Sequence, residues 1–188
     1  VLSCSAADVI LIAGSQFELG STPSSYIPTT TTVTRAAETL TVPAANLPYN
    51  STNMSIQMDG KMTYADNGLS GEVQYYRWLL NSTNYITSSL STLTGRVGQI
   101  GFSQRQSPIS GYDFVAGTNT DYSPDTNVPF NFAVRNGSTF INAAHEGTLL
   151  TANTTPTALP DLSAIDLILG SIFMGTIGEF RMWSDDLG

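Results

Sequence analysis

The stretch Pro129-Phe-Asn-Phe-Ala-Val-Arg135 sets its large apolar side chains, Phe, Phe and Val, at alternate positions. Successive side chains of a β-strand point to opposite faces, so this period of two predicts a strand with one buried face. Asn136-Gly137 follows directly, and this dipeptide is typical of a two-residue type I′ hairpin turn. Thr139 to Ala143 is then expected to return as the second strand of the hairpin.

The same alternation recurs along most of the chain, whereas a helical period is almost absent. The further expected strands are Met54 to Met58, which turns at Asp59-Gly60 into Lys61 to Ala65, then Gly71 to Leu80 with its partner Asn84 to Ser88, Val97 to Phe102, Ile165 to Gly170, and Ile177 to Trp183. Short strands at intervals of roughly 8 to 12 residues, separated by turn residues, are typical of an antiparallel sandwich. The fold class expected from this pattern is all-β, with an antiparallel β-sandwich.

Two end segments carry a family resemblance. The segment Gly175-Thr-Ile-Gly-Glu-Phe-Arg-Met-Trp-Ser-Asp-Asp-Leu-Gly188 resembles the closing strand of laminin-G-like, concanavalin-A-like domains. The segment Gln16-Phe-Glu-Leu-Gly-Ser-Thr-Pro-Ser-Ser-Tyr-Ile-Pro-Thr29, with Val33 to Glu38 after it, resembles the junction that precedes such a lectin-like domain in bacteriophage structural proteins. The resemblance covers nearly the whole chain, although only its ends are motif-specific. It implies a jelly-roll sandwich and brings no catalytic residue with it.

Residues 1–35 are expected to form an N-terminal strand and an extended arm, or the end of a preceding module, and residues 36–188 the lectin-like sandwich. Within the arm, Ser21 to Thr34 is rich in proline and threonine, and prolines fix φ and remove hydrogen-bond donors. The core of the sandwich is expected to contain Phe130, Phe132, Val134, Phe180 and Trp183.

The chain is acidic, with seven Lys plus Arg against fifteen Asp plus Glu, a net charge of −8 and a pI near 4.3. This balance repels phosphate backbones and anionic lipid headgroups, so nucleic-acid binding is not expected. The apolar run Val9 to Ala13 is too short to span a bilayer, so membrane insertion is not expected either. Cys4 is the single cysteine, and it supports neither an intrachain disulfide nor a cysteine metal site.

The sequence offers no catalytic residue, so the chain is expected not to be an enzyme. His145 is the single histidine, with no nucleophile motif to accompany it, and a surface or turn position is expected for it. Glycosidases place two carboxylates at the scissile bond, whereas the glutamates here are scattered singly. Carboxylates from distant strands could still converge, which leaves a polysaccharide-degrading domain as an alternative.

The segment Gly111 to Asn127 is the candidate recognition loop. It gathers aromatic rings that can stack on a sugar with carboxylates and amides that can bond its hydroxyls: Tyr112, Asp113, Asn119, Asp121, Tyr122 and Asp125. Such residues also build ordinary loops, which is the competing interpretation. The three aspartates could instead hold Ca²⁺ through oxygen ligands; otherwise no cofactor and no metal site are expected.

Tyr75-Tyr76-Arg77-Trp78 is the densest aromatic cluster of the sequence. In a regular strand, Tyr75 and Arg77 face one way while Tyr76 and Trp78 face the other. One pair is therefore expected in the core, and the other is a candidate for an exposed aromatic platform or a subunit contact.

The resemblance implies a function as well as a fold: a non-enzymatic, receptor- or glycan-binding module of a phage tail fibre or tailspike. The implied location is extracellular, on the virion, with other virion subunits as partners and a homotrimer as the assembly. An alternative with the same fold is a capsid or tail decoration protein that binds no glycan.

Overall fold

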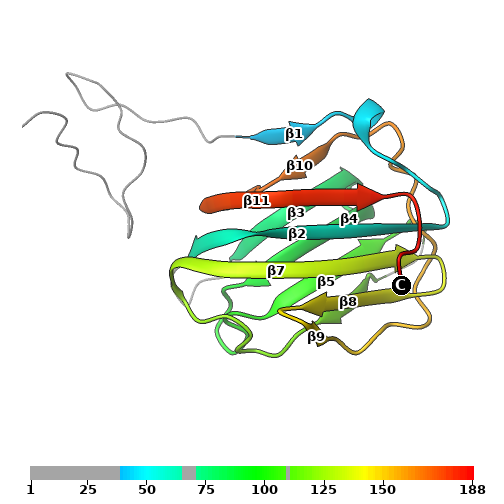
Figure 1. Cartoon of the computed structure of the whole chain (residues 1–188). Helices are drawn as coiled ribbons and strands as arrows, with labels where there is room; N and C mark the ends of the chain where they lie inside the picture. The colour runs from blue at the N-terminus through cyan, green and yellow to red at the C-terminus, as the bar shows by residue number, and fades with distance from the viewer. Residues whose placement is uncertain (1–38, 65–70, 109–110) are drawn as a thin grey trace, which may run out of the picture. The chain divides into compact units, whose positions relative to one another are not determined.

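The computed structural model describes residues 39–64, 71–108 and 111–188, which form strands and one short 3₁₀ helix (Figure 1). The elements are β1 Leu40–Val42, the helix η1 Ala44–Asn46, β2 Asn53–Tyr64, β3 Glu72–Asn81, β4 Asn84–Ser91, β5 Ile100–Arg105, β6 Asp113–Ala116, β7 Asp125–Gly137, β8 Ile141–His145, β9 Thr148–Leu149, β10 Leu167–Leu169 and β11 Gly175–Trp183. Among these described residues no helix is long and apolar enough to cross a membrane.

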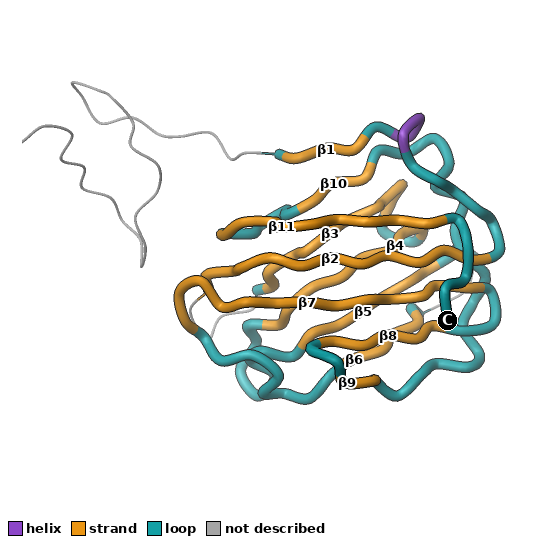
Figure 2. The backbone as a smooth tube through the Cα atoms, in the orientation of Figure 1, coloured by secondary structure: helices purple, strands orange, loops and turns teal. Residues whose placement is uncertain are grey.

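The strands build two antiparallel sheets that face each other, which Figures 1 and 2 show one in front of the other. One sheet has six strands in the order β1-β10-β3-β4-β5-β6, and the other has five in the order β11-β2-β7-β8-β9. Strands distant in sequence are neighbours in both sheets, as in β10 beside β3 and β11 beside β2. The predicted antiparallel β-sandwich is thereby confirmed.

The core lies between the sheets and combines aliphatic and methionine side chains with a cluster of aromatic rings. Phe132 is 1% exposed and its ring lies 5.2 Å from both Tyr75 and Phe102, centroid to centroid. Phe130 and Val134 are buried on the same face of β7. The prediction that these alternate residues of β7 face the interior is confirmed, because burying one face of the strand removes all three from water together.

The C-terminal strand β11 does not bury both of its predicted anchors. Phe180 packs half-buried against the core, but Trp183 lies three residues further along and therefore on the opposite face of the strand. Trp183 is paired with Ser55 of β2, whose hydroxyl donates to the carbonyl of Asp185. The chain after β11 thus crosses the outer face of the five-stranded sheet, and the prediction of Trp183 as a core residue is wrong.

Both turns predicted from glycine dipeptides are wrong. β2 continues through Asp59-Gly60, and β7 continues through Asn136-Gly137, so the hairpin turns two residues later at Ser138-Thr139. Both glycines instead allow another part of the chain to lie close to the strand backbone. A Cβ on Gly60 would lie 2.2 Å from the carbonyl oxygen of Thr176, and one on Gly137 would lie 2.7 Å from the ring of Phe140.

The predicted platform of Tyr75, Tyr76 and Trp78 is also wrong, because all three side chains are fully buried. A β-bulge between Gln74 and Tyr76 inserts Tyr75 as an extra residue of β3, so two consecutive tyrosines turn inward. Arg77 then keeps its outward direction. None of the three rings is available for a ligand or a second subunit.

The predicted N-terminal strand and arm, residues 1–35, lie outside the described residues, as does Cys4. The domain boundary between residues 35 and 36 therefore stays a prediction.

Candidate functional site

The outer face of the six-stranded sheet carries rows of side chains set by the strand register. One row runs from Arg77 on β3 through Thr87 on β4 and Ser103 on β5 to Phe114 on β6. Side chains directly opposite each other in neighbouring strands lie on the same face, so these four project together. Neighbouring strands lie about 4.8 Å apart, which places the backbones of the first and last member of the row about 14 Å apart.

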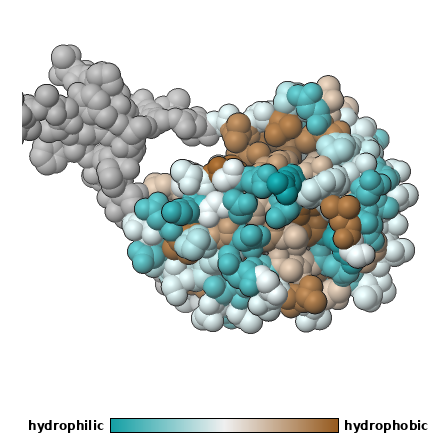
Figure 3. All heavy atoms as spheres, in the orientation of Figure 1, coloured by the Kyte–Doolittle hydropathy of each residue, from teal (hydrophilic) through white to brown (hydrophobic). Residues whose placement is uncertain are grey.

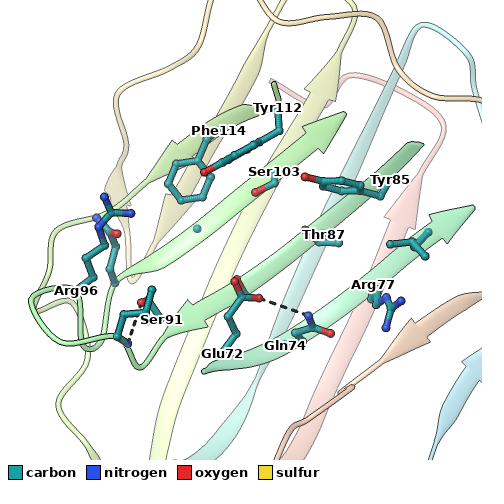
Figure 4. Close-up of a pocket in the computed structure, with 15 residues that line it drawn as sticks. Glu72, Gln74, Arg77, Tyr85, Thr87, Ser91, Arg96, Ser103, Tyr112 and Phe114 are labelled. Atoms are coloured by element: carbon teal, nitrogen blue, oxygen red, sulfur yellow. Dashed lines mark hydrogen bonds between the residues drawn. The ribbon is translucent and has the colours of Figure 1, made fainter. Parts of the chain in front are cut away.

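Side-chain size along the rows explains why this face is hollow. The two middle strands contribute small residues, Thr87 and Ser103 in one row and Ser89 and Gly101 in the next. Large side chains stand on the flanking strands on both sides. The result is a groove of about 480 Å³, here called the outer-face groove (Figure 4). Its lining residues are Glu72, Gln74, Arg77, Leu79, Tyr85, Thr87, Ser89, Ser91, Leu93, Arg96, Gln99, Gly101, Ser103, Tyr112 and Phe114.

The wall on the β6 side is aromatic. Tyr112 and Phe114 form an edge-to-face pair with centroids 5.9 Å apart, and they are 57% and 39% exposed. A Cβ on Gly101 would lie 2.5 Å from the Phe114 ring, so this ring leans over the groove floor only because position 101 is a glycine. Exposed aromatic rings beside a hydrophilic floor offer both an apolar face and hydrogen-bonding groups to a ligand.

The floor and the β3 side are polar. The Thr87, Ser89 and Ser103 hydroxyls can donate and accept hydrogen bonds. The Tyr85 phenol can also donate and accept hydrogen bonds, and burial raises its pKa above the ordinary value. At this edge Glu72 accepts a hydrogen bond from the Gln74 amide at 3.4 Å, as the dashed line in Figure 4 shows. The groove therefore pairs a hydroxyl-rich floor with aromatic and charged walls.

The predicted recognition loop does not form a single site. Of its six candidate residues, Tyr112 alone lines the outer-face groove. Asp113 points away from it and accepts hydrogen bonds from the backbone amide and the hydroxyl of Thr157. Asp121 accepts from the amide and hydroxyl of Thr118, and its side chain is 4% exposed. Both aspartates hold loops in place.

The remaining candidates lie elsewhere. Asn119 and Tyr122 line a shallow surface hollow together with Pro124. Asp125 is the first residue of β7, and its carboxylate accepts a hydrogen bond from the backbone amide of Thr126. The three aspartates do not gather, and within the described ranges no three Asp, Glu, His or Cys side chains cluster as metal ligands. Nothing in their arrangement supports the Ca²⁺ alternative.

His145 is buried, contrary to the prediction of a surface or turn position. It ends β8 in the inward-facing series Ile141, Ala143, His145, and its Nε2 atom lies 3.5 Å from Oδ1 of Asp121. Its neighbour Tyr122 donates to Glu146 at 3.3 Å. Burial, and next the Glu146 carboxylate, raise the pKa of the Tyr122 phenol above its ordinary value. This cluster joins the loop before β7 to the end of β8.

A second hollow, also of about 480 Å³, lies on the outer face of the five-stranded sheet. It is lined mainly by alanines and leucines, including Ala133 and Leu149, and its Arg135 is already paired with Asp186. Figure 3 shows this sheet's outer face as a mixture of hydrophilic and hydrophobic residues. Because Arg135 is already in an ion pair, this hollow offers fewer free polar groups to a ligand than the outer-face groove does.

The sequence prediction missed the groove floor, because Thr87, Ser89 and Ser103 are ordinary strand residues when each is taken alone. Their significance depends on which strands are neighbours. A usable signal was nevertheless present: serine and threonine occupy alternate positions of the predicted strand Asn84 to Ser88 and its continuation.

The sequence matches no family model and no curated protein. Solved structures match in fold. The CBM40 of Ruminococcus gnavus IT-sialidase bound to α2,3-sialyllactose has a TM-score of 0.54 at 13% identity, over 73% of this chain and 78% of that chain. The leech intramolecular trans-sialidase has a TM-score of 0.55 at 17% identity, over 73% of this chain and 22% of that one.

The botulinum neurotoxin serotype D binding domain has a TM-score of 0.54 at 13% identity, over 76% of this chain and 35% of that chain. The match thus spans about a third or less of the neurotoxin and trans-sialidase chains. At identities this low the likeness shows the fold alone. The chain has the β-sandwich fold that lectin-like domains share.

Proposed function

We propose that this chain is a non-catalytic carbohydrate-binding module and that the sugar binds in the outer-face groove. The observation that carries the proposal is the combination of the exposed rings of Tyr112 and Phe114 with the hydroxyl floor of Thr87, Ser89 and Ser103. Rings pack against the C–H face of a sugar, and hydroxyls exchange hydrogen bonds with its own hydroxyls. A fold neighbour of similar size, the R. gnavus CBM40, binds sialyllactose, which supports the same class of ligand.

The single carboxylate that lines the groove supports a binding role over hydrolysis. Glycoside hydrolysis uses two carboxyl groups about 5 to 10 Å apart across the scissile bond. Among the described residues that line the groove, Glu72 is the single carboxylate, and it lies at the edge beside Gln74. The binding expected at such an open site is weak, since a sugar exchanges water hydrogen bonds for protein ones at little net gain.

The test is a glycan array probed with the full chain, followed by titration of the strongest ligand. Ser103→Trp places a large ring on the groove floor and is expected to abolish binding. Ala133→Trp introduces the same ring on the exposed outer face of the other sheet and is expected to leave binding unchanged. Both variants should keep the circular-dichroism spectrum of the parent. Equal binding by the two variants would exclude the groove as the site.

The biological setting rests on the resemblance of the two end segments to phage structural proteins. We propose a tail-fibre or tailspike module that is displayed on the virion and assembled as a homotrimer. A decoration protein without glycan binding and a polysaccharide-degrading domain are the two alternatives. Light scattering of the full chain tests the trimer, and release of reducing ends from host polysaccharide tests the degrading alternative.

A further inference from the structure

Unpaired positive charge collects in the outer-face groove, although the chain as a whole carries a net charge of −8. On the five-stranded sheet and the segment after it, Arg135 pairs with Asp186 and Arg181 pairs with Glu179. Arg77, in contrast, lines the groove without an ion pair or side-chain hydrogen bond to another described residue.

The nearest carboxylate on its own strand does not neutralise Arg77. Glu72 lies five residues earlier on β3, beyond the bulge at Tyr75, which corresponds to roughly 15 Å of strand. The Glu72 carboxylate is also engaged by the Gln74 amide. Figure 4 shows Glu72 and Gln74 together and Arg77 apart from them.

The position of Arg77 suits a ligand on the groove floor. β3 holds its backbone between β4 and β10, opposite Thr87 and Ile168. Its side chain shares a row with the hydroxyls of Thr87 and Ser103. A strand in the middle of a sheet is a rigid base, so the backbone of Arg77 is held at a fixed point beside the floor. Figure 4 draws its guanidinium on the side of β3 away from Thr87, so a change of side-chain rotamer would bring it over the floor.

A second arginine adds to the charge of the groove. Arg96 lies in the connection between β4 and β5 and lines the groove at another edge, again without a charged partner among the described residues. Two guanidinium groups against the one carboxylate of Glu72 leave the groove with a positive balance. Field lines concentrate in a cleft lined by charge of one sign, which favours an anion there.

We infer that the sugar recognised in the groove carries a carboxylate, and that Arg77 is the residue that determines this specificity. The inference rests on the proposed function. A guanidinium presents its N–H donors in a planar fork that matches the two oxygens of a carboxylate, and such charge-assisted pairs are stronger than bonds between neutral groups. Phe114, at the other end of the same row, remains free to pack against the sugar ring.

The experiment compares acidic and neutral members of matched pairs by calorimetry with the full chain. The probes are 3′-sialyllactose against lactose, and an oligosaccharide ending in glucuronic acid against the same oligosaccharide ending in glucose. For at least one pair the acidic member is expected to bind about ten- to a hundredfold more tightly. The preference should decrease with added salt, because ions screen an exposed charge pair.

Three variants locate the preference. Arg77→Gln is expected to remove it while residual binding of the neutral sugar persists. Arg77→Lys keeps the positive charge but lacks the planar fork of donors, and this variant should retain part of the preference for the acidic sugar. Lys61→Gln removes the positive charge of an exposed residue on β2, outside the groove, and this variant should retain the full preference.

The outcomes separate the inference from the proposed function. Equal binding of acidic and neutral members overturns the inference and leaves carbohydrate binding in place. A preference that survives in Arg77→Gln overturns the role of Arg77. Binding of no sugar, on the array or by calorimetry, overturns the proposed function, and the inference fails with it.

Discussion

Phe132→Ala tests the cluster of aromatic rings that packs between the two sheets. The ring is 1% exposed and has four aromatic neighbours, with centroids 5.2 to 6.3 Å away. Removing a buried phenylalanine ring costs about 3 to 5 kcal/mol, as lost transfer free energy plus a cavity. Two of the neighbours lie on β3, one on β5 and one on β7, so no single strand can move in to fill the cavity. We therefore expect the free energy of unfolding to fall by about 4 kcal/mol.

The measurement is urea unfolding of the full chain, monitored by tryptophan fluorescence, since Trp78 is fully buried and its emission reports on the core. Thermal unfolding should show a lower Tm, by about 6 to 20 °C for a domain of this size. Phe114→Ala is the matched control. It removes the same ring from an outer face where it is 39% exposed, and we expect a loss of less than about 1.5 kcal/mol. Equal losses for the two variants would refute the assignment of Phe132 to the core.

Three further perturbations test features that hold the sandwich together. Gln104→Ala should lower the free energy of unfolding by about 2 to 4 kcal/mol, because it leaves the buried Asn136 amide and two backbone carbonyls without their partner; an unchanged urea midpoint would contradict this. Gly60→Ala should destabilise by more than 1 kcal/mol, since its methyl group would meet a backbone oxygen at 2.2 Å, and urea unfolding measures this loss too. Burial raises the pKa values of Tyr75 and Tyr76, so the stability that these residues confer is complete below pH 10 and decreases above it. Part of the tyrosinate absorbance should therefore appear only when the protein unfolds. Complete titration of the tyrosines in the native protein would disprove their burial.

Sequence alone predicted the fold class, because period-two alternation is a local property. β7 shows this most clearly: Phe130, Phe132 and Val134 are buried, and their neighbours Asn131 and Ala133 are exposed. β3 and β4 begin within one residue of their predicted positions. Where alternation is regular and the buried residues are large, burial follows directly from the pattern.

The failures have a common physical cause, which is contact between residues distant in sequence. Asp59-Gly60 and Asn136-Gly137 have turn composition, but these glycines sit where another backbone or ring comes within van der Waals distance. The bulge at Tyr75 is another case. It reverses the expected direction of one tyrosine, and no local feature of the four-residue aromatic cluster indicated it.

The candidate site depends on the same long-range information. The predicted recognition loop gathered polar and aromatic residues by their nearness in sequence, yet Asp113 and Asp121 are used to anchor the chain. The outer-face groove gathers its residues across four strands instead. Arg77 and Phe114 are 37 positions apart in the sequence and belong to one row only because β4 and β5 lie between their strands. The specificity proposed for the outer-face groove would therefore depend on the strand order, and substitutions that change one row are expected to alter the proposed binding while leaving the fold intact.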